Sequence, residues 1–298
     1  MQVMMAGYQG AGSVHTQALA ALAAALPGAE MQADVTASGA TAASLFAGTE
    51  AGHAPRICYV ASGYLSARVP SLGALDLPFA APDRARLFAA LDGPAGAMIA
   101  AEVAARTGLV VLGFWDNGLR HLSNRARPLR TPTDCAGLVI RTLDNAVYQS
   151  ALAAMGFSPV VTDVLRLKQA VASGEVDAQE NPLTNLILFG LQAHHRFVSL
   201  TGHIQGVALL VANRAWHDTL PSPDRTRLAQ AATTATTLQR SLAAAEDARA
   251  LALLHTDGVN VLTPDAIDMT AFRAACAPVA AAAAAGIDPE LLRTLAGG

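Results

Sequence analysis

The sequence predicts an α/β fold of two lobes that share one long helix, and three observations support this class. Residues 137–178 alternate short apolar strands with helices, which indicates a βαβαβ unit with parallel strands. Residues 224–255 contain neither glycine nor proline, enough for roughly 48 Å of helix at 1.5 Å per residue. The chain of 298 residues is long enough for two sizeable cores. A long alanine-rich surface helix on a single domain is the alternative.

The amino-terminal segment is expected to form a strand over Met1–Ala6, a glycine-rich turn over Gly7–Gly12 and a helix over Ser13–Leu26. The same order builds the phosphate-binding part of a dinucleotide site, and Asp34 stands near the place of a ribose-binding acid. The spacing Gly-x-x-Gly-x-Gly departs from the usual Gly-x-Gly-x-x-Gly. A nucleotide-dependent oxidoreductase that uses the Gly7–Gly12 loop is therefore the alternative function, and this spacing disfavours it.

Two polar residues stand at strand ends in the βαβαβ unit. Arg141 closes an apolar strand, and Asn181 follows the third strand. Ligands bind beyond the carboxyl ends of parallel strands, and a guanidinium beside an amide is suited to holding a carboxylate. An internal salt bridge is the alternative role for Arg141. The predicted strands are Gly137–Arg141, Ser158–Thr162 and Val176–Ala178, and the predicted helices are Ala146–Met155 and Asp163–Gly174.

The carboxyl-terminal third is expected to hold the long helix, a strand and a last helix. Ser222-Pro223-Asp224 is a start signal and Gly258 a stop, so the long helix is predicted over Asp224–His255. A short return strand is predicted over Val259–Leu262. The last helix is predicted over Met269–Ala285, with Pro278 as a point of interruption.

Composition and motifs exclude several classes of function. The formal net charge of −3 and the lack of a basic stripe with aromatic residues argue against nucleic acid. No apolar run approaches the roughly 18 residues of a membrane span. No enzyme activity is expected, because neither Gly-x-Ser-x-Gly nor a Walker loop occurs. No cofactor or metal is expected either, because the cysteines and histidines lack metal-ligand spacing.

An ordered set of short segments runs from Leu75 to about Leu220. The segments are Leu75–Phe79, Leu112–Arg120, Pro132–Arg141, Ala154–Gly156, Ala170–Asp177, Gln179–Pro182 and Thr201–His203. In order and spacing they resemble the periplasmic solute-binding subunits of TRAP transporters, also called the four-carbon-dicarboxylate-binding type. In that family the arginine after a Gly-Leu-x-Ile strand forms a salt bridge with the ligand carboxylate, and its position here is Arg141. The resemblance also implies that Arg120, in a Gly-x-Arg motif, assists and that Asn181 completes the clamp.

This resemblance implies a fold like that of periplasmic binding proteins, with the ligand between two lobes. Lobe I is expected over residues 1–118 plus 207–240, and lobe II over residues 119–206 plus 241–298. The implied function is extracytoplasmic capture of a small organic acid and its delivery to the membrane permease of the transporter. The protein is expected to be a periplasmic monomer whose signal peptide has been removed.

Further side chains are expected to line the ligand cleft. An apolar or stacking wall would come from Trp115, Tyr64 and Phe79, hydroxyl-binding groups from Asn145 and Gln205, and a first-lobe contact from Tyr8 beside Gln9. Phe114, Tyr148, Asp116 and Asn117 are further candidates. Each of these side chains has a role in the core as its alternative. The candidate ligands are dicarboxylates, 2-oxo acids, hydroxy or sugar acids and aromatic acids, and hydroxy or sugar acids are favoured.

Overall fold

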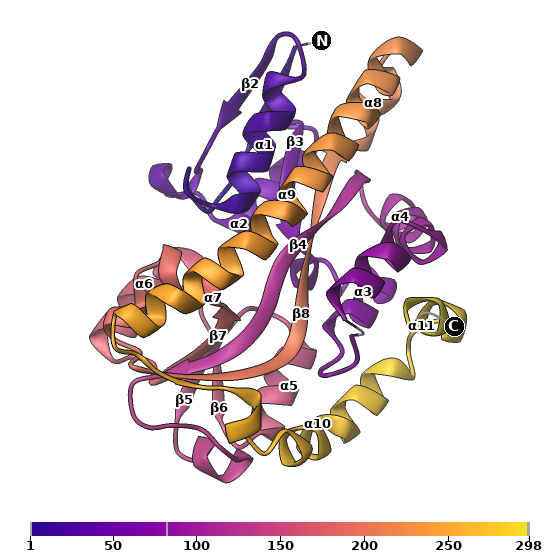
Figure 1. The fold of residues 1–298 in the computed structure, drawn as a ribbon. Helices are drawn as coiled ribbons and strands as arrows, with labels where there is room; N and C mark the ends of the chain where they lie inside the picture. The colour runs from indigo at the N-terminus through magenta and orange to yellow at the C-terminus, as the bar shows by residue number, and fades with distance from the viewer. Residues whose placement is uncertain (1, 82, 297–298) are drawn as a thin grey trace.

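The computed structural model describes residues 2–81 and 83–296, and it shows an α/β fold of two lobes (Figure 1). Met1, which the sequence places in the first strand, lies outside the described residues, as do residues 297–298 of the expected lobe II. Within the described residues, nine strands form one sheet in the order β2-β1-β3-β8-β4-β7-β5-β6, with β9 paired to β8. The strands are β1 Val3–Ala6, β2 Ala29–Gln32, β3 Ile57–Ala61, β4 Leu109–Asn124, β5 Val139–Thr142, β6 Ser158–Val161, β7 Ala178–Pro182, β8 Phe197–Asn213 and β9 Asn260–Leu262.

Helices cover both faces of the sheet (Figure 1). They are α1 Val14–Ala24, α2 Ala42–Glu50, α3 Arg84–Leu91, α4 Pro94–Arg106, α5 Ala146–Ala154, α6 Val164–Ser173, α7 Leu183–Leu188, α8 Arg214–Thr219, α9 Ser222–Thr256, α10 Met269–Ala284 and α11 Pro289–Leu295. Local signals explain the ends of α6, because the Asp163 side chain accepts a hydrogen bond from the Leu165 amide and Gly174 ends the helix at φ +81°. Pro278 does not interrupt α10.

The predicted βαβαβ unit is confirmed, with one shifted strand. β5 pairs in parallel with both β6 and β7. The third strand was predicted over Val176–Ala178, but β7 covers Ala178–Pro182, so Asn181 lies inside the strand. The polar run Gln179-Glu180-Asn181 concealed a strand that is buried along its whole length, because its side chains find partners in distant parts of the chain.

Two long strands, β4 with 16 residues and β8 with 17, run through both lobes as one curved ribbon (Figure 1). They pair antiparallel, and their register shifts between Asp116 and Gly118. Gly118 has φ +82°, and a Cβ there would lie 2.7 Å from the Pro182 Cβ. Opposite it, a Cβ on Gly206 would lie 2.9 Å from the Gly118 carbonyl oxygen. The passage between the lobes therefore requires glycine on both strands.

Each lobe has its own apolar core. The first core draws on residues from Val3 to Trp115 and from Val207 to Ala235. The second lobe holds two larger clusters, built from residues between Leu122 and Val198 and between Ala250 and Cys276, and a small one of Leu143, Tyr148 and Ile204. Helix α11 contributes Leu291 and Leu295 to the first core, and Ile287 joins them from just before the helix, although the sequence assigned all of residues 241–298 to lobe II.

Helix α9 crosses both lobes, as the sequence predicted, and it contains 35 residues. Leu228 packs in the first core and Leu254 in the second lobe. The polar middle of α9 is hydrogen-bonded to β4. The Thr236 hydroxyl accepts a hydrogen bond from Trp115 Nε1 (3.0 Å), and the Gln239 side chain bonds the Asp116 amide and carbonyl (2.7 Å each). The helix is thereby fixed to β4 beside the passage between the lobes.

No single helix in the described part of the chain is both long and apolar enough to cross a membrane. Helices α3 and α4 would be long and apolar enough only when taken together, and the two are bent by 57° relative to each other. Their apolar residues, among them Leu87 and Ile99, are buried in the first core.

Replacing Thr236 by valine should lower the free energy of unfolding by about 1–3 kcal/mol. The substitution keeps the shape of the side chain but leaves the fully buried indole N–H of Trp115 without its acceptor. Thr237→Val is the matched control, because the exposed Thr237 hydroxyl bonds only the Thr233 carbonyl of the same helix. Urea denaturation measures both variants, and equal losses of stability would contradict the role of the Trp115–Thr236 bond.

Candidate functional site

A cavity lies between the lobes, where the carboxyl ends of parallel strands from both halves of the sheet meet. Tyr8 follows β1 and Ala61 ends β3, while Arg141 lies in β5 and Asn181 in β7. The cavity contains about 360 Å³ of space free of protein atoms, its open mouth included. Its lining residues are Tyr8, Gln9, Ala61, Tyr64, Asn117, Arg120, Arg141, Leu143, Val164, Asn181, Asn185 and Phe189.

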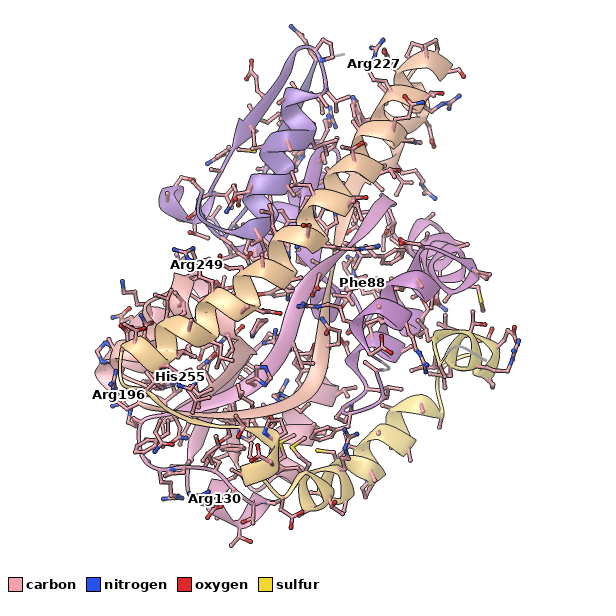
Figure 2. All side chains as sticks on the ribbon, viewed as in Figure 1. Phe88, Arg130, Arg196, Arg227, Arg249 and His255 are labelled. Atoms are coloured by element: carbon pink, nitrogen blue, oxygen red, sulfur yellow. The ribbon has the colours of Figure 1, made fainter. Side chains whose placement is uncertain are left out.

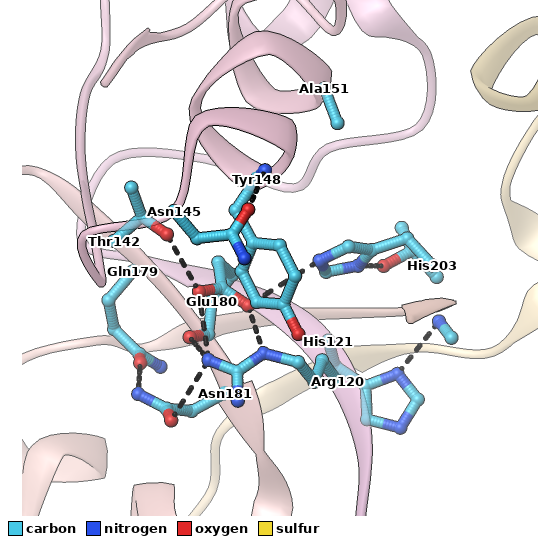
Figure 3. Close-up of polar contacts among 12 residues, drawn as sticks. Arg120, His121, Thr142, Asn145, Tyr148, Ala151, Gln179, Glu180, Asn181 and His203 are labelled. Carbon is cyan, nitrogen blue, oxygen red and sulfur yellow. Dashed lines mark hydrogen bonds and ion pairs between the residues drawn. The ribbon is translucent and has the colours of Figure 1, made fainter. Parts of the chain in front are cut away.

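One wall of the cavity contains a buried ion pair between Arg120 on β4 and Glu180 on β7 (Figure 3). Arg120 Nε donates to one carboxylate oxygen of Glu180, and Arg120 Nη2 donates to the other at 2.8 Å. The same Nη2 reaches the Glu180 carbonyl (2.9 Å) and Asn181 Oδ1 (3.3 Å). The guanidinium also lies over the Tyr148 ring, 5.4 Å from its centroid. The two-point geometry fixes the plane of the guanidinium.

Glu180 is a buried carboxylate with several partners. The Thr142 hydroxyl donates to it at 3.1 Å, and His203 Nε2 lies 3.7 Å from it. Burial alone would raise the pKa of Glu180, but the charge of Arg120, the neighbouring His203 and the hydrogen bonds from Arg120 lower it to about 2. Burial likewise opposes the charge on Arg120, and Glu180 raises the pKa of Arg120 above its ordinary value. Both groups are therefore charged, and their charges cancel.

Arg141 lies in the same cavity but has no such partner. Its side chain is 3% exposed, and its Nε donates to the Thr162 carbonyl at 2.7 Å. Among the described residues no carboxylate lies within 4.0 Å of its guanidinium, so the internal salt bridge considered from the sequence does not form. Burial lowers the pKa of Arg141, while Tyr64 and Glu180 act in the opposite direction. A buried cation without a counterion is suited to an anionic ligand.

Neutral polar groups form much of the remaining wall. Asn181 is held by Gln179, whose Oε1 accepts from Asn181 Nδ2 at 2.5 Å, and by Arg120. Gln9 accepts a hydrogen bond from the Ser13 hydroxyl at 2.8 Å. Burial raises the pKa values of both Tyr8 and Tyr64, which keeps their hydroxyls uncharged at neutral pH.

Seven of the residues proposed from the sequence lie away from the cavity lining, namely Trp115, Phe79, Asn145, Gln205, Phe114, Tyr148 and Asp116. Trp115 donates to Thr236, and Gln205 Nε2 donates to Asp116 Oδ1 at 3.0 Å. Asn145 caps α5 and donates to Asp76 Oδ2 at 2.7 Å, while Phe79 packs against Arg273. The structure brings Arg120, Arg141, Asn181, Tyr64 and Tyr8 to the cavity.

Sequence reasoning did not find five lining residues, namely Ala61, Leu143, Val164, Asn185 and Phe189. Four of them are apolar residues on short connections or at the ends of strands and helices, where apolar character indicates a core position equally well. Asn185 carried the one usable signal, a buried amide in the otherwise apolar helix Leu183–Leu188.

The glycine-rich loop that motivated the oxidoreductase alternative already uses its amides internally. The amides of Tyr8 and Gln9 both donate to the Tyr59 hydroxyl at 3.2 Å. Asp34, the candidate ribose ligand, bonds the amide and hydroxyl of Thr36. The loop therefore shows no free phosphate-binding amides at these positions, and nothing supports the nucleotide site. Within the described residues, no group of three or more His, Cys, Asp or Glu side chains could hold a metal ion.

The fold is that of a two-lobed α/β solute-binding protein, and the cavity lies between its lobes. The chain belongs to the family described as bacterial extracellular solute-binding protein, family 7, which matches residues 36–286. This result confirms the resemblance to TRAP solute-binding subunits.

Relatives and a solved structure agree with this assignment. A 2,3-diketo-L-gulonate-binding periplasmic protein of Escherichia coli is 31% identical over 68% of this chain and 61% of its own length. A C4-dicarboxylate-binding periplasmic protein of Rhodobacter capsulatus is 31% identical over 62% of this chain and 55% of its own. The chain thus spans less than two thirds of these relatives. A TRAP periplasmic solute-binding protein from Roseobacter denitrificans, with bound β-D-glucuronate, is 26% identical with a TM-score of 0.91, and 99% of each chain is covered.

Glu180→Gln should lower the free energy of unfolding at pH 7 by about 3–5 kcal/mol, because it leaves Arg120 buried and unpaired. The pKa of Glu180 falls on folding from 4.5 to about 2. A depressed pKa contributes stability above about pH 4.5 that is lost as the pH falls toward 2. The difference between wild type and variant should therefore narrow over that range.

Chemical denaturation at several pH values measures this difference. Glu175→Gln is the control, because Glu175 is exposed and its ion pair with Arg166 (3.1 Å) is at the surface. A constant difference between wild type and Glu180→Gln from pH 6 down to pH 2 would contradict the ionised state assigned to Glu180.

Proposed function

We propose that this protein is the extracytoplasmic solute-binding protein of a TRAP transporter. It captures a small organic acid, whose carboxylate Arg141 anchors, and delivers it to the membrane permease. The single observation that carries the proposal is the buried guanidinium of Arg141, which faces the interlobe cavity without a carboxylate partner. Desolvation in such a site strengthens the attraction between a guanidinium and a carboxylate.

The comparisons support this ligand class. Two of the related proteins are named for binding 2,3-diketo-L-gulonate and C4-dicarboxylates, and the solved structure contains bound β-D-glucuronate. All of these compounds are organic acids. Asn181 is placed to assist Arg141, because its side chain is held in the cavity wall by Gln179 and Arg120. Arg120 then acts mainly by positioning Asn181 and Glu180.

Binding without chemical conversion is the proposed activity. Among the described residues, Glu180 is the one carboxylate in an ion pair with a cavity residue, and Arg120 keeps it ionised. No nucleophile with an adjacent base lines the described cavity. The protein is proposed to act in the periplasm, as the related periplasmic proteins do, and to act there as a monomer.

Arg141→Ala should weaken binding of the organic acid by about 30-fold to several thousand-fold, corresponding to roughly 2–5 kcal/mol. A thermal-shift screen of organic acids finds the ligand, since a compound that binds only the folded state raises the melting temperature. Isothermal titration calorimetry then measures the affinity. Arg141→Lys should restore binding only in part, because an ammonium lacks the two-point geometry.

Arg130→Ala is the control for the loss of a positive charge. Arg130 is exposed at the outer surface of the second lobe (Figure 2), and its guanidinium forms no ion pair among the described residues. A folded Arg141→Ala protein with wild-type affinity would overturn the proposed anchor.

Ligand binding should make the molecule more compact. We propose that lobe I comprises residues 1–118 plus 207–240 together with α11, and lobe II residues 119–206 plus the remainder of 241–298. The lobes would close about the glycine-containing passage of β4 and β8, with α9 bending beside it. Small-angle X-ray scattering should show a smaller radius of gyration with ligand, and Arg141→Ala at the same ligand concentration should show no change. Equal radii for the wild type with and without ligand would exclude closure.

A further inference from the structure

The charges in the interlobe cavity restrict the kind of organic acid that it accepts. Resting on the proposed function, we propose that the cavity selects monocarboxylates with several hydroxyl groups and rejects dicarboxylates of the same length. The names of the related proteins leave this choice open, because they include both kinds of acid.

Few cationic side chains line the cavity. Arg120 and Arg141 are the only lysine, arginine or histidine side chains among the described lining residues. Glu180 neutralises Arg120 through both carboxylate oxygens. The chain's single lysine, Lys168, is exposed on α6 and does not line the cavity. One positive charge, that of Arg141, is therefore left for a ligand.

Nearby histidines do not add a second charge. His15 is buried and His121 is half-buried, and desolvation lowers the pKa of each to about 3. Neither ring is therefore protonated at neutral pH. His203 lies on the far side of Glu180, at 3.7 Å, and does not line the cavity.

The rest of the cavity lining would face the end of the ligand that is away from the carboxylate held by Arg141. It contains neutral hydrogen-bonding side chains together with apolar ones. The neutral polar residues are Tyr8, Gln9, Tyr64, Asn117 and Asn185, and the apolar ones are Leu143, Val164 and Phe189. Amides and phenols both donate and accept hydrogen bonds, so they match hydroxyl groups.

Asn117 gives this wall its most specific feature. Its side chain is 8% exposed and lines the cavity, yet its amide has no hydrogen-bond partner among the described residues. Because its amide atoms are not fully enclosed by protein, they are open to a hydrogen bond with a ligand or water in the cavity. We therefore assign Asn117 to a ligand hydroxyl. It lies on β4 three residues before Arg120, so its place relative to the ion pair is fixed by the strand.

A second carboxylate would enter this wall without a counterion. It could pair with Arg120 only by displacing Glu180, which would leave that carboxylate buried and unpaired instead. Either arrangement buries an uncompensated negative charge, whereas a hydroxyl at the same place needs only hydrogen bonds. A dicarboxylate should therefore bind on the order of 100-fold more weakly, or worse, than the matching monocarboxylate.

Pairs of sugar acids that differ at one end test this selection. Galactonate and galactarate share chain length and hydroxyl configuration, but galactarate has a carboxylate where galactonate has a CH2OH group. Gluconate with glucarate and threonate with tartrate extend the comparison to other configurations and lengths. Calorimetry at pH 7.5 should show binding of the monocarboxylate in at least one pair, with its dicarboxylate on the order of 100-fold weaker. Equal or tighter binding of the dicarboxylate would overturn the selection and leave the proposed function standing.

Two variants change the charge count by different routes. Glu180→Gln removes the compensation of Arg120, and Asn117→Lys adds a cation at another position of the cavity lining. In each folded variant the affinity for galactarate, relative to that for galactonate, should rise by about tenfold or more. Asn117→Met is the control, because methionine has a length similar to lysine but no charge, and it should leave this ratio unchanged. An unchanged ratio in both charge variants would overturn the charge count. Failure of every organic acid to bind the wild type would overturn the proposed function itself, and the selection with it.

Discussion

The ion pair between Arg120 and Glu180 determines both the register of the sheet and the charge of the cavity. The two residues belong to adjacent antiparallel strands, where Leu122 pairs with Glu180 and Arg120 with Pro182. A slip of one residue between β4 and β7 would turn one side chain to the opposite face and leave two buried charges unpaired. The same contact cancels the charge of Arg120 and fixes Arg141 as the one cation available to a ligand.

The cavity and the passage between the lobes are built from one short piece of β4. Asp116 is bonded through its backbone to Gln239 of α9, and its carboxylate accepts a hydrogen bond from the Gly118 amide at 2.7 Å. Asn117 and Arg120 point into the cavity from the same few residues. Movement of the lobes about this passage would therefore displace cavity residues directly, without any intermediate element.

Local signals made much of the fold predictable, and distant partners made the remainder unpredictable. Asp163 and Gly174 mark the ends of α6 because their effects are confined to neighbouring residues. Strand β7 was misplaced because its polar side chains are satisfied by residues such as Arg120, 60 positions away from Glu180. Trp115 was offered as a ligand contact, but its partner Thr236 is 121 positions away. Large aromatic and amide side chains occur both in pockets and in cores, so the sequence does not distinguish a pocket-lining residue from a core residue and the folded structure is needed to do so.

The uncompensated charge of Arg141 is a cost that the folded protein carries for binding. A second acid beside Arg141 would relieve this cost in the free protein, as Glu180 does for Arg120. It would also occupy the guanidinium and repel an anionic ligand. The Arg141 guanidinium is stabilised in part by a neutral group, because its Nε donates a hydrogen bond to the Thr162 carbonyl. The other nitrogen atoms of the guanidinium have no carboxylate partner among the described residues. The two arginines of the cavity therefore differ in charge compensation: Arg120 is paired within the wall, and Arg141 has no carboxylate partner among the described residues, as the proposed carboxylate anchor requires.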